Sequence, residues 1–147
     1  MLVLDANILV RAVLGHRVRQ LVETYAAQGV RFCAPATAFD EAQKYLTPLL
    51  AKRGKSAADL PAALNYLRYV IEPVDWDLYG PFEDEARRRL QGRDEKDWPV
   101  LASALALACA VWTEDRDFFG TGIAVWTTNR IEIFLAAQIR PQTTEGP

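Results

Sequence analysis

Four acidic residues are placed where folding could gather them at one site: Asp5, Glu41, Asp97 and Asp115. Carboxylates within about 4–6 Å of one another repel by several kcal/mol at an effective dielectric near 20, so such a cluster needs a divalent cation or shared protons. Ligands that are all oxygen select hard ions, which favours Mg²⁺ or Mn²⁺ over zinc. An ion held in this way can bind a phosphate and activate water, so the pattern indicates phosphodiester hydrolysis.

Two of these acids follow short apolar segments with the character of buried strands. Asp5 comes directly after Leu2–Leu4, and Asp115 comes after Glu114 at the end of the predicted strand Ala110–Thr113. Continuous apolar runs of this length are typical of parallel sheets, in which ligands bind beyond the carboxyl ends of the strands. We therefore expect both acids on one rim, while a single strand-terminal Asp is more often a turn former.

The other two acids belong to predicted helices. Glu41 falls on the apolar side of a helix expected over residues 35–52, so we expect its side chain to point towards the body of the protein. Asp97 opens an alanine-rich helix expected over Asp97–Ala108, one turn after Asp94. Each has a structural alternative, which is an ion pair with an arginine for Glu41 and a helix cap or dipole partner for Asp97.

The order of the predicted elements favours an α/β fold with a mainly parallel sheet. Further strands are expected at residues 30–34, 123–127 and, as an alternative to a helix end, 70–74. Further helices are expected at residues 8–27 (divided at Gly15), 56–71, 77–90 and 131–139. Half of the 147 residues are apolar, so residues 1–140 are expected to form one domain, followed by a disordered tail at 141–147.

The composition argues against several classes of protein. The net charge is −2 and the sequence pI about 5.4, so any RNA contact must be local or bridged by a metal. A single histidine argues against a histidine-based zinc site. No signal peptide and no membrane span are expected, which favours a cytoplasmic protein. Cys33 and Cys109 are then expected as reduced thiols, with one disulfide as the alternative.

The order and spacing of the acids resemble the PIN-domain family over roughly Leu2–Ile139. The segments that carry the resemblance are Asp5-Ala6-Asn7, Glu41–Leu46, Asp97 with Val100–Ala104, and Thr113–Phe118. The resemblance implies a three-layer fold with a five-stranded sheet of order 3-2-1-4-5 flanked by helices. It also implies a metal-dependent endoribonuclease that uses Mg²⁺ or Mn²⁺, often as the VapC-type toxin of a type II toxin–antitoxin pair. The resemblance further implies three partners, which are an RNA substrate, an antitoxin protein and a second copy of the chain in a homodimer.

By position, the resemblance assigns the four acids to the metal site. Asp5 and Asp97 would hold the ion, and Glu41 and Asp115 would complete the set of negative charges around it. Asn7 would support an acid or contact a phosphate.

Four further residues are held as candidates around that site. Asp94 and Asp117 are possible additional acids, and Arg11 and Arg93 are candidate phosphate contacts. The run Arg87–Arg89 is expected instead to be a solvated helix face.

Three other classes share some of these features. A catalytically silent PIN-like module could bind RNA or a partner, but such a scaffold has no need of all four acids. A receiver domain would require an acidic pair after the first strand and a late lysine, whereas Asp5 stands alone and no lysine follows Lys96. A metal-dependent phosphatase for small molecules is compatible with the acids. The long helical region at residues 46–96 leaves the subfamily open.

Overall fold

The computed structural model describes residues 1–139, so the tail expected at 141–147 lies outside the described part. Five parallel strands form one sheet of order β3-β2-β1-β4-β5, which confirms the expected order. The strands are β1 (Leu2–Leu4), β2 (Phe32–Pro35), β3 (Glu72–Val74), β4 (Ala110–Trp112) and β5 (Val125–Trp126). The short strand near residue 72 is therefore formed, and the sheet has no antiparallel pair among the described residues.

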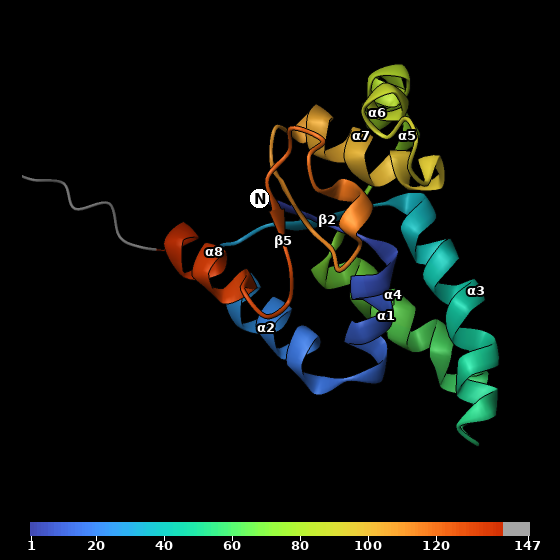
Figure 1. Ribbon diagram of the computed structural model, residues 1–147. Helices are drawn as coiled ribbons and strands as arrows, with labels where there is room; N and C mark the ends of the chain where they lie inside the picture. Colours follow the sequence, from blue (N-terminus) through green and yellow to red (C-terminus); the bar gives the residue numbers. More distant parts are fainter. Residues whose placement is uncertain (140–147) are drawn as a thin grey trace, which may run out of the picture.

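Helices cover both faces of this sheet, as a three-layer α/β fold requires (Figure 1). The helices are α1 (Ala6–Leu14), α2 (His16–Ala27), α3 (Ala36–Lys52), α4 (Leu60–Val70), α5 (Trp76–Tyr79), α6 (Glu83–Arg89), α7 (Trp98–Leu107) and α8 (Ile131–Gln138). Within residues 1–139, no helix is long and apolar enough to cross a membrane.

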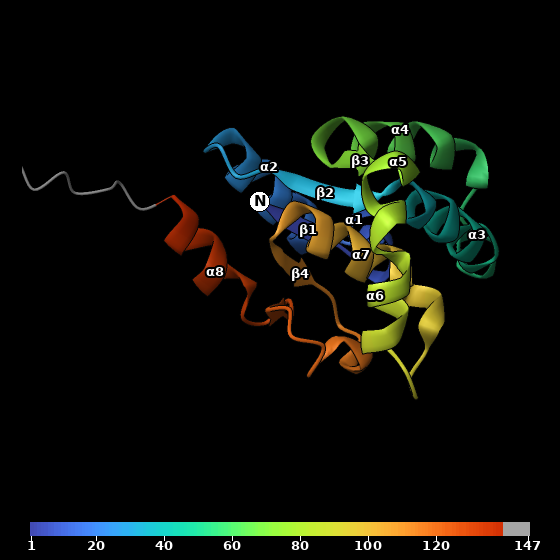
Figure 2. The same ribbon diagram turned by 90° about the horizontal axis from the view of Figure 1, so that it is seen from above.

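Alternation along β1 divides the core into two clusters. Leu2 and Leu4 face the larger cluster, which contains the apolar sides of α1 to α4, while Val3 faces α6 and α7 on the other side. Successive side chains of a strand point to opposite faces, which explains this division. Figure 2 shows α7 lying across β1 and β4, on the face opposite α2 and α4.

The prediction of one continuous helix over residues 77–90 is wrong. The chain instead forms α5, a 3₁₀ turn at Gly80–Phe82, and α6. Pro81 has no N–H to continue the helical hydrogen bonds. A Cβ at Gly80 would lie 2.7 Å from the Trp76 ring, so the turn also depends on the close approach of this glycine. The division of the first helical region at Gly15 is confirmed.

The two edges of the sheet are short. β3 has three residues, includes Pro73, and carries an exposed Glu72 that pairs with Arg31 at 2.6 Å. β5 has only two residues. Cys33, in β2, and Cys109, before β4, are both free thiols.

Truncation of Leu4 tests the central strand. Leu4 is fully buried at the end of β1. We expect Leu4→Ala to lower the free energy of unfolding by about 2–5 kcal/mol, because it removes apolar contacts and leaves a cavity. Ile133→Ala is the matched control, because Ile133 is 63% exposed and such a change is expected to shift stability by no more than about 0.5 kcal/mol. Urea unfolding measures the free energy of unfolding of both variants. Equal decreases in the two variants would contradict the burial of Leu4 in the core.

Candidate active site

The sheet brings the first and last acids of the predicted set to one rim. β1 and β4 pair in parallel with Leu4 opposite Trp112. The backbone N–H of Asp5 then donates to the Trp112 carbonyl oxygen at 3.1 Å. Because both strands end at this point, Asp5 and the segment that leads to Asp115 leave the sheet side by side.

Asp5 is buried, with only 4% of its surface exposed, and three groups donate to its carboxylate. Its Oδ1 accepts from the backbone N–H of Ala6 at 2.6 Å, which caps α1. Its Oδ2 accepts from the Asn7 side-chain amide at 2.9 Å and from the Thr113 hydroxyl at 2.7 Å. Asp5 therefore caps α1, and its second carboxylate oxygen is held at the rim of the sheet by Asn7 and Thr113.

Thr113 joins Asp5 to the last acid, and the sequence reasoning gave it no role. Its hydroxyl oxygen donates to Asp5 and accepts from the backbone N–H of Asp115 at 2.9 Å. The Asp115 carboxylate in turn accepts from the backbone N–H of Asp117 at 2.9 Å. Its place as the last residue of the predicted strand, immediately before the acids, is the signal that could have identified Thr113. In the structure its polar side chain is fully buried.

Burial and like charges raise the pKa of two of the acids. The pKa of Asp5 rises from 3.8 to about 6, mainly because burial removes water from the carboxylate. Hydrogen bonds from Thr113 and Ala6 act in the opposite direction, and the charges of Glu41 and Asp115 raise the pKa further.

The pKa of Asp97 is raised as well, which ties two further acids to the site. Burial is the largest cause, followed by the charge of Asp5, a hydrogen bond shared with Asp115, and the charges of Asp115 and Asp94. The structure therefore places Asp5, Asp97 and Asp115 within mutual electrostatic range, with Asp94 nearby. Although Asp97 occupies the N-cap position of α7, its side chain makes no capping hydrogen bond, so the capping alternative is wrong for it.

Glu41 lies at the rim of the site with its side chain exposed, so the expectation that it points into the body of the protein is wrong. The buried side of α3 is carried by Ala38, Ala42 and Leu46, and Glu41 lies beside that side rather than on it. Glu41 still lies close enough to raise the pKa of Asp5, and it lines a groove with Asn7. The alternative of an arginine partner is not observed in residues 1–139.

The four acids are not neutralised by basic side chains in the described part of the chain. None of the seven ion pairs found there involves any of the four. In the same residues, no three acidic, histidine or cysteine side chains already converge as ligands of one metal ion. The carboxylates are therefore neighbours that repel one another, and their oxygens would have to rotate to meet at a single ion.

The candidate residues around the acids have different roles. Asp117 lies two residues after Asp115 in the same 3₁₀ turn, and its carboxylate accepts from the backbone N–H of Asp94 at 3.2 Å, so Asp117 connects the loops on either side of the site. Arg93 donates to the carbonyl oxygens of Asp117 and Phe119. Its guanidinium is therefore engaged by backbone in this structure.

The arginine run is a solvated helix face for two of its three members, so that expectation is wrong for Arg89 alone. Arg88 is exposed, as expected. Arg87 pairs with Glu83 and lies over the Trp98 ring, 5.3 Å from its centroid. Arg89 is half-buried and contacts the turn after Asp115.

Two grooves adjoin the acids. One, of about 400 Å³, lies between α1 and α3 and is lined by Asn7, Arg11, Glu41 and Tyr45 over an apolar floor. The other, of about 610 Å³, lies beside α6 and is lined by Arg87, Arg93, Asp94, Glu95, Lys96 and Trp98. Each groove therefore combines acids near the site with cations and an aromatic ring.

The comparison with protein families agrees with this geometry. A family model described as "PIN domain" matches residues 3–136, so the chain belongs to the PIN-domain family. PIN domains are generally nucleases that bind nucleic acid and use divalent metal ions. Comparison with curated proteins and with solved structures gives no match.

The raised pKa of Asp5 predicts how stability depends on pH without divalent ions. A folded-state pKa above the unfolded value contributes stability that is fully present below pH 3.8 and is lost as pH rises through about 6. We expect a loss of roughly 3 kcal/mol from this group, because each pKa unit corresponds to about 1.4 kcal/mol. Urea unfolding in EDTA between pH 4 and 8 measures the loss.

A matched pair of variants separates the site from the other acids. Asp97→Asn removes a second carboxyl whose pKa is raised in the folded state, so it should reduce the pH dependence. Asp40→Asn changes an exposed acid that pairs with Arg68 at 4.0 Å. This variant should keep the pH dependence of the wild type. A metal-free stability that rises steadily between pH 4 and 8 would be inconsistent with the raised pKa.

Proposed function

We propose that the protein is a metal-dependent endoribonuclease, with Asp5, Glu41, Asp97 and Asp115 as the acids of its active site. The observation that carries this proposal is the meeting of these acids without a basic partner in the described residues, at the carboxyl edge of a parallel sheet. Perturbed carboxylate pKa values cluster at functional sites. Membership of the PIN-domain family supports the same conclusion.

The donor set fits Mg²⁺ or Mn²⁺. All the candidate ligands are oxygens, which hard divalent ions prefer, and a cation would offset the repulsion between carboxylates that adds to the effect of burial on the pKa values of Asp5 and Asp97. Asp5 and Asp97 would hold the ion, and Glu41 and Asp115 would complete the set of negative charges around it. When bound, such an ion supplies a water of lowered pKa and a positive charge beside the phosphate.

The residues around the acids have their own tasks in this proposal. Asn7 and Thr113 hold the Asp5 carboxylate in one orientation by donating to Oδ2. Arg11, which is exposed in the groove between α1 and α3, would contact a phosphate of the RNA. Tyr45, which is 62% exposed in the same groove, offers a ring on which a base could stack.

The acidic chain binds nucleic acid through these local groups rather than through a general basic surface. The net charge of −2 supplies no long-range attraction for a polyanion. The biological role that we propose is the toxin of a type II toxin–antitoxin pair, acting as a cytoplasmic homodimer until an antitoxin binds. The family relationship supports this role, and light scattering with the product of a neighbouring small gene tests it.

A cleavage assay tests the activity. Fluorescent single-stranded RNA is incubated with the protein and Mn²⁺, Mg²⁺ or EDTA. We expect cleavage with either ion, none in EDTA, and a loss of more than about 100-fold in Asp5→Asn, because removal of a ligand exceeds the usual effect of removing a group that merely supports one. Asp40→Asn, an exposed acid outside the site, is the matched control.

Two outcomes would contradict the proposal in different ways. Cleavage by Asp5→Asn at the wild-type rate would remove Asp5 from the site. Binding of RNA and metal without cleavage would favour the silent binding module, and hydrolysis of small phosphomonoesters instead of RNA would favour a phosphatase.

The groove between α1 and α3 yields a separate prediction. Because Arg11 is expected to bind substrate rather than to hold the ion, Arg11→Ala should raise KM by about 10-fold and leave kcat within about 3-fold, as loss of uniform binding does. Arg17→Ala is the control, because Arg17 pairs with Glu132 at 3.0 Å on α8. Steady-state kinetics with short RNA measures both constants, and a fall in kcat alone would show that Arg11 acts in the chemical step.

A further inference from the structure

Two arginines hold the turn that follows the last acid against α6 and the segment after it. Arg89 donates from Nη1 to the Thr121 carbonyl oxygen at 3.0 Å. Arg93 donates from Nη1 to the Asp117 carbonyl oxygen at 2.7 Å and also to that of Phe119. We call these two side chains and their three carbonyl partners the arginine clamp. Charged donors make stronger hydrogen bonds to carbonyl oxygens than neutral donors do, so the clamp restrains the backbone of the turn.

Two glycines of this turn combine a left-handed backbone with close contacts to the arginines. Gly120 and Gly122 adopt φ values of 82° and 84°, which L side chains rarely adopt. A Cβ at Gly120 would lie 3.2 Å from Arg93 Nη2, and one at Gly122 would lie 3.0 Å from Arg89 Nη1. The glycines therefore let the guanidinium groups approach the backbone.

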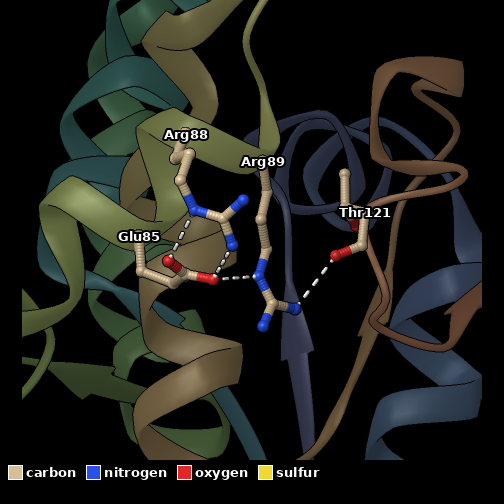
Figure 3. Close-up of polar contacts among 4 residues, drawn as sticks. All are labelled: Glu85, Arg88, Arg89 and Thr121. Carbon is tan, nitrogen blue, oxygen red and sulfur yellow. Dashed lines mark hydrogen bonds and ion pairs between the residues drawn. The ribbon is translucent and has the colours of Figure 1, made fainter.

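Arg89 is itself held in place from the other end. Its Nε donates to Glu85 Oε1 at 2.9 Å, and Arg88 also pairs with this carboxylate, at 2.5 Å. Figure 3 shows Glu85 between the two guanidinium groups, with Arg89 reaching from it to Thr121. Hydrogen bonds from Arg88 and Arg89 lower the pKa of Glu85 to about 2, so the carboxylate stays ionised at neutral pH.

A chain of hydrogen bonds leads from the clamp to the acids. The backbone N–H of Asp94, next to Arg93, donates to Asp117 Oδ2 at 3.2 Å. The backbone N–H of Asp117 donates to Asp115 Oδ1 at 2.9 Å, and that of Asp115 donates to the Thr113 hydroxyl at 2.9 Å. Asp115 is therefore bound on one side to the sheet and on the other to the clamped turn.

We propose that Arg93 and Arg89 are positioning residues of the nuclease site, which keep the Asp115 carboxylate beside Asp97 by fixing the turn over residues 117–121. The need for such a restraint follows from the local structure. Asp115 lies at the start of a short 3₁₀ turn rather than on a strand or long helix, so its position depends on what holds that turn. The inference rests on the proposed function, and neither arginine is assigned a contact with RNA in it.

Three substitutions in the full chain separate positioning from other effects. Arg93→Met removes the donors to the carbonyls of Asp117 and Phe119. Arg93→Lys keeps a charged donor beside the two carbonyl oxygens, both of which accept from the single atom Nη1 of Arg93. Arg88→Met is the matched control, because Arg88 is 68% exposed and pairs with Glu85 alone. The readouts are amide hydrogen exchange over residues 115–121, Mn²⁺ affinity by calorimetry, and RNA cleavage.

Arg93→Met is expected to speed amide exchange in the turn and to weaken Mn²⁺ binding and cleavage by about 10- to 100-fold, as loss of a group that orients a ligand does. Arg93→Lys should recover most of each property, and Arg88→Met should match the wild type. If Arg93→Met does not fold, Arg89→Met applies the same test. Wild-type exchange and Mn²⁺ affinity in a folded Arg93→Met or Arg89→Met would overturn the proposal.

The failure of the proposed function would look different. A wild-type protein that neither binds Mn²⁺ nor cleaves RNA would overturn the nuclease assignment and, with it, the role of the clamp in a metal site. Exchange over residues 115–121 would then report only whether the arginines restrain the turn.

Discussion

Parallel pairing of β1 with β4 is the constraint on which the site depends. Because Leu4 lies opposite Trp112, both strands end together, and the chain places an acid within a few residues of each end. Thr113 then bridges Asp5 and the Asp115 backbone, so the distance between the two acids is set by the sheet rather than by flexible side chains. A shift of one residue in this register would turn Thr113 to the other face and separate the acids.

The same arrangement opposes stability. Burial of Asp5 next to other carboxylates raises its pKa, which means that the ionised form is held in the folded state at a cost in free energy. Other parts of the structure offset this cost. Two buried apolar clusters support the sheet, and the arginine clamp holds the turn that follows Asp115. Strained functional groups on a rigid frame are a common compromise between stability and activity.

Local patterns in the sequence were enough to predict most of the sheet. The apolar runs before Asp5 and Glu114 mark buried strands, and the rule for parallel sheets then places the acids on one edge. The order of the strands came from the family resemblance. The interruption at Gly80-Pro81 was missed because a run with helical spacing can be broken by one proline without losing its apolar pattern.

Side-chain orientations at the rim could not be predicted in the same way. Glu41 was assigned to the apolar side of its helix, yet it is exposed, because the tertiary arrangement covers the side of α3 that carries Ala38 and Ala42 instead. The partners of Arg93 are carbonyl oxygens 24 and 26 residues away, and a backbone acceptor leaves no trace in residue types. Thr113 was overlooked because a hydroxyl at a strand end has many ordinary uses.

The edges of the sheet limit how copies of this protein can associate. β3 is short, contains Pro73 without an N–H, and carries the charged Glu72, while β5 offers only two residues. Neither edge is a good template for a strand from another chain, since short edges, proline and charge are the usual protection against sheet extension. Self-association into a continuous intermolecular sheet is therefore disfavoured, and a stable complex between copies has to use helical surfaces instead.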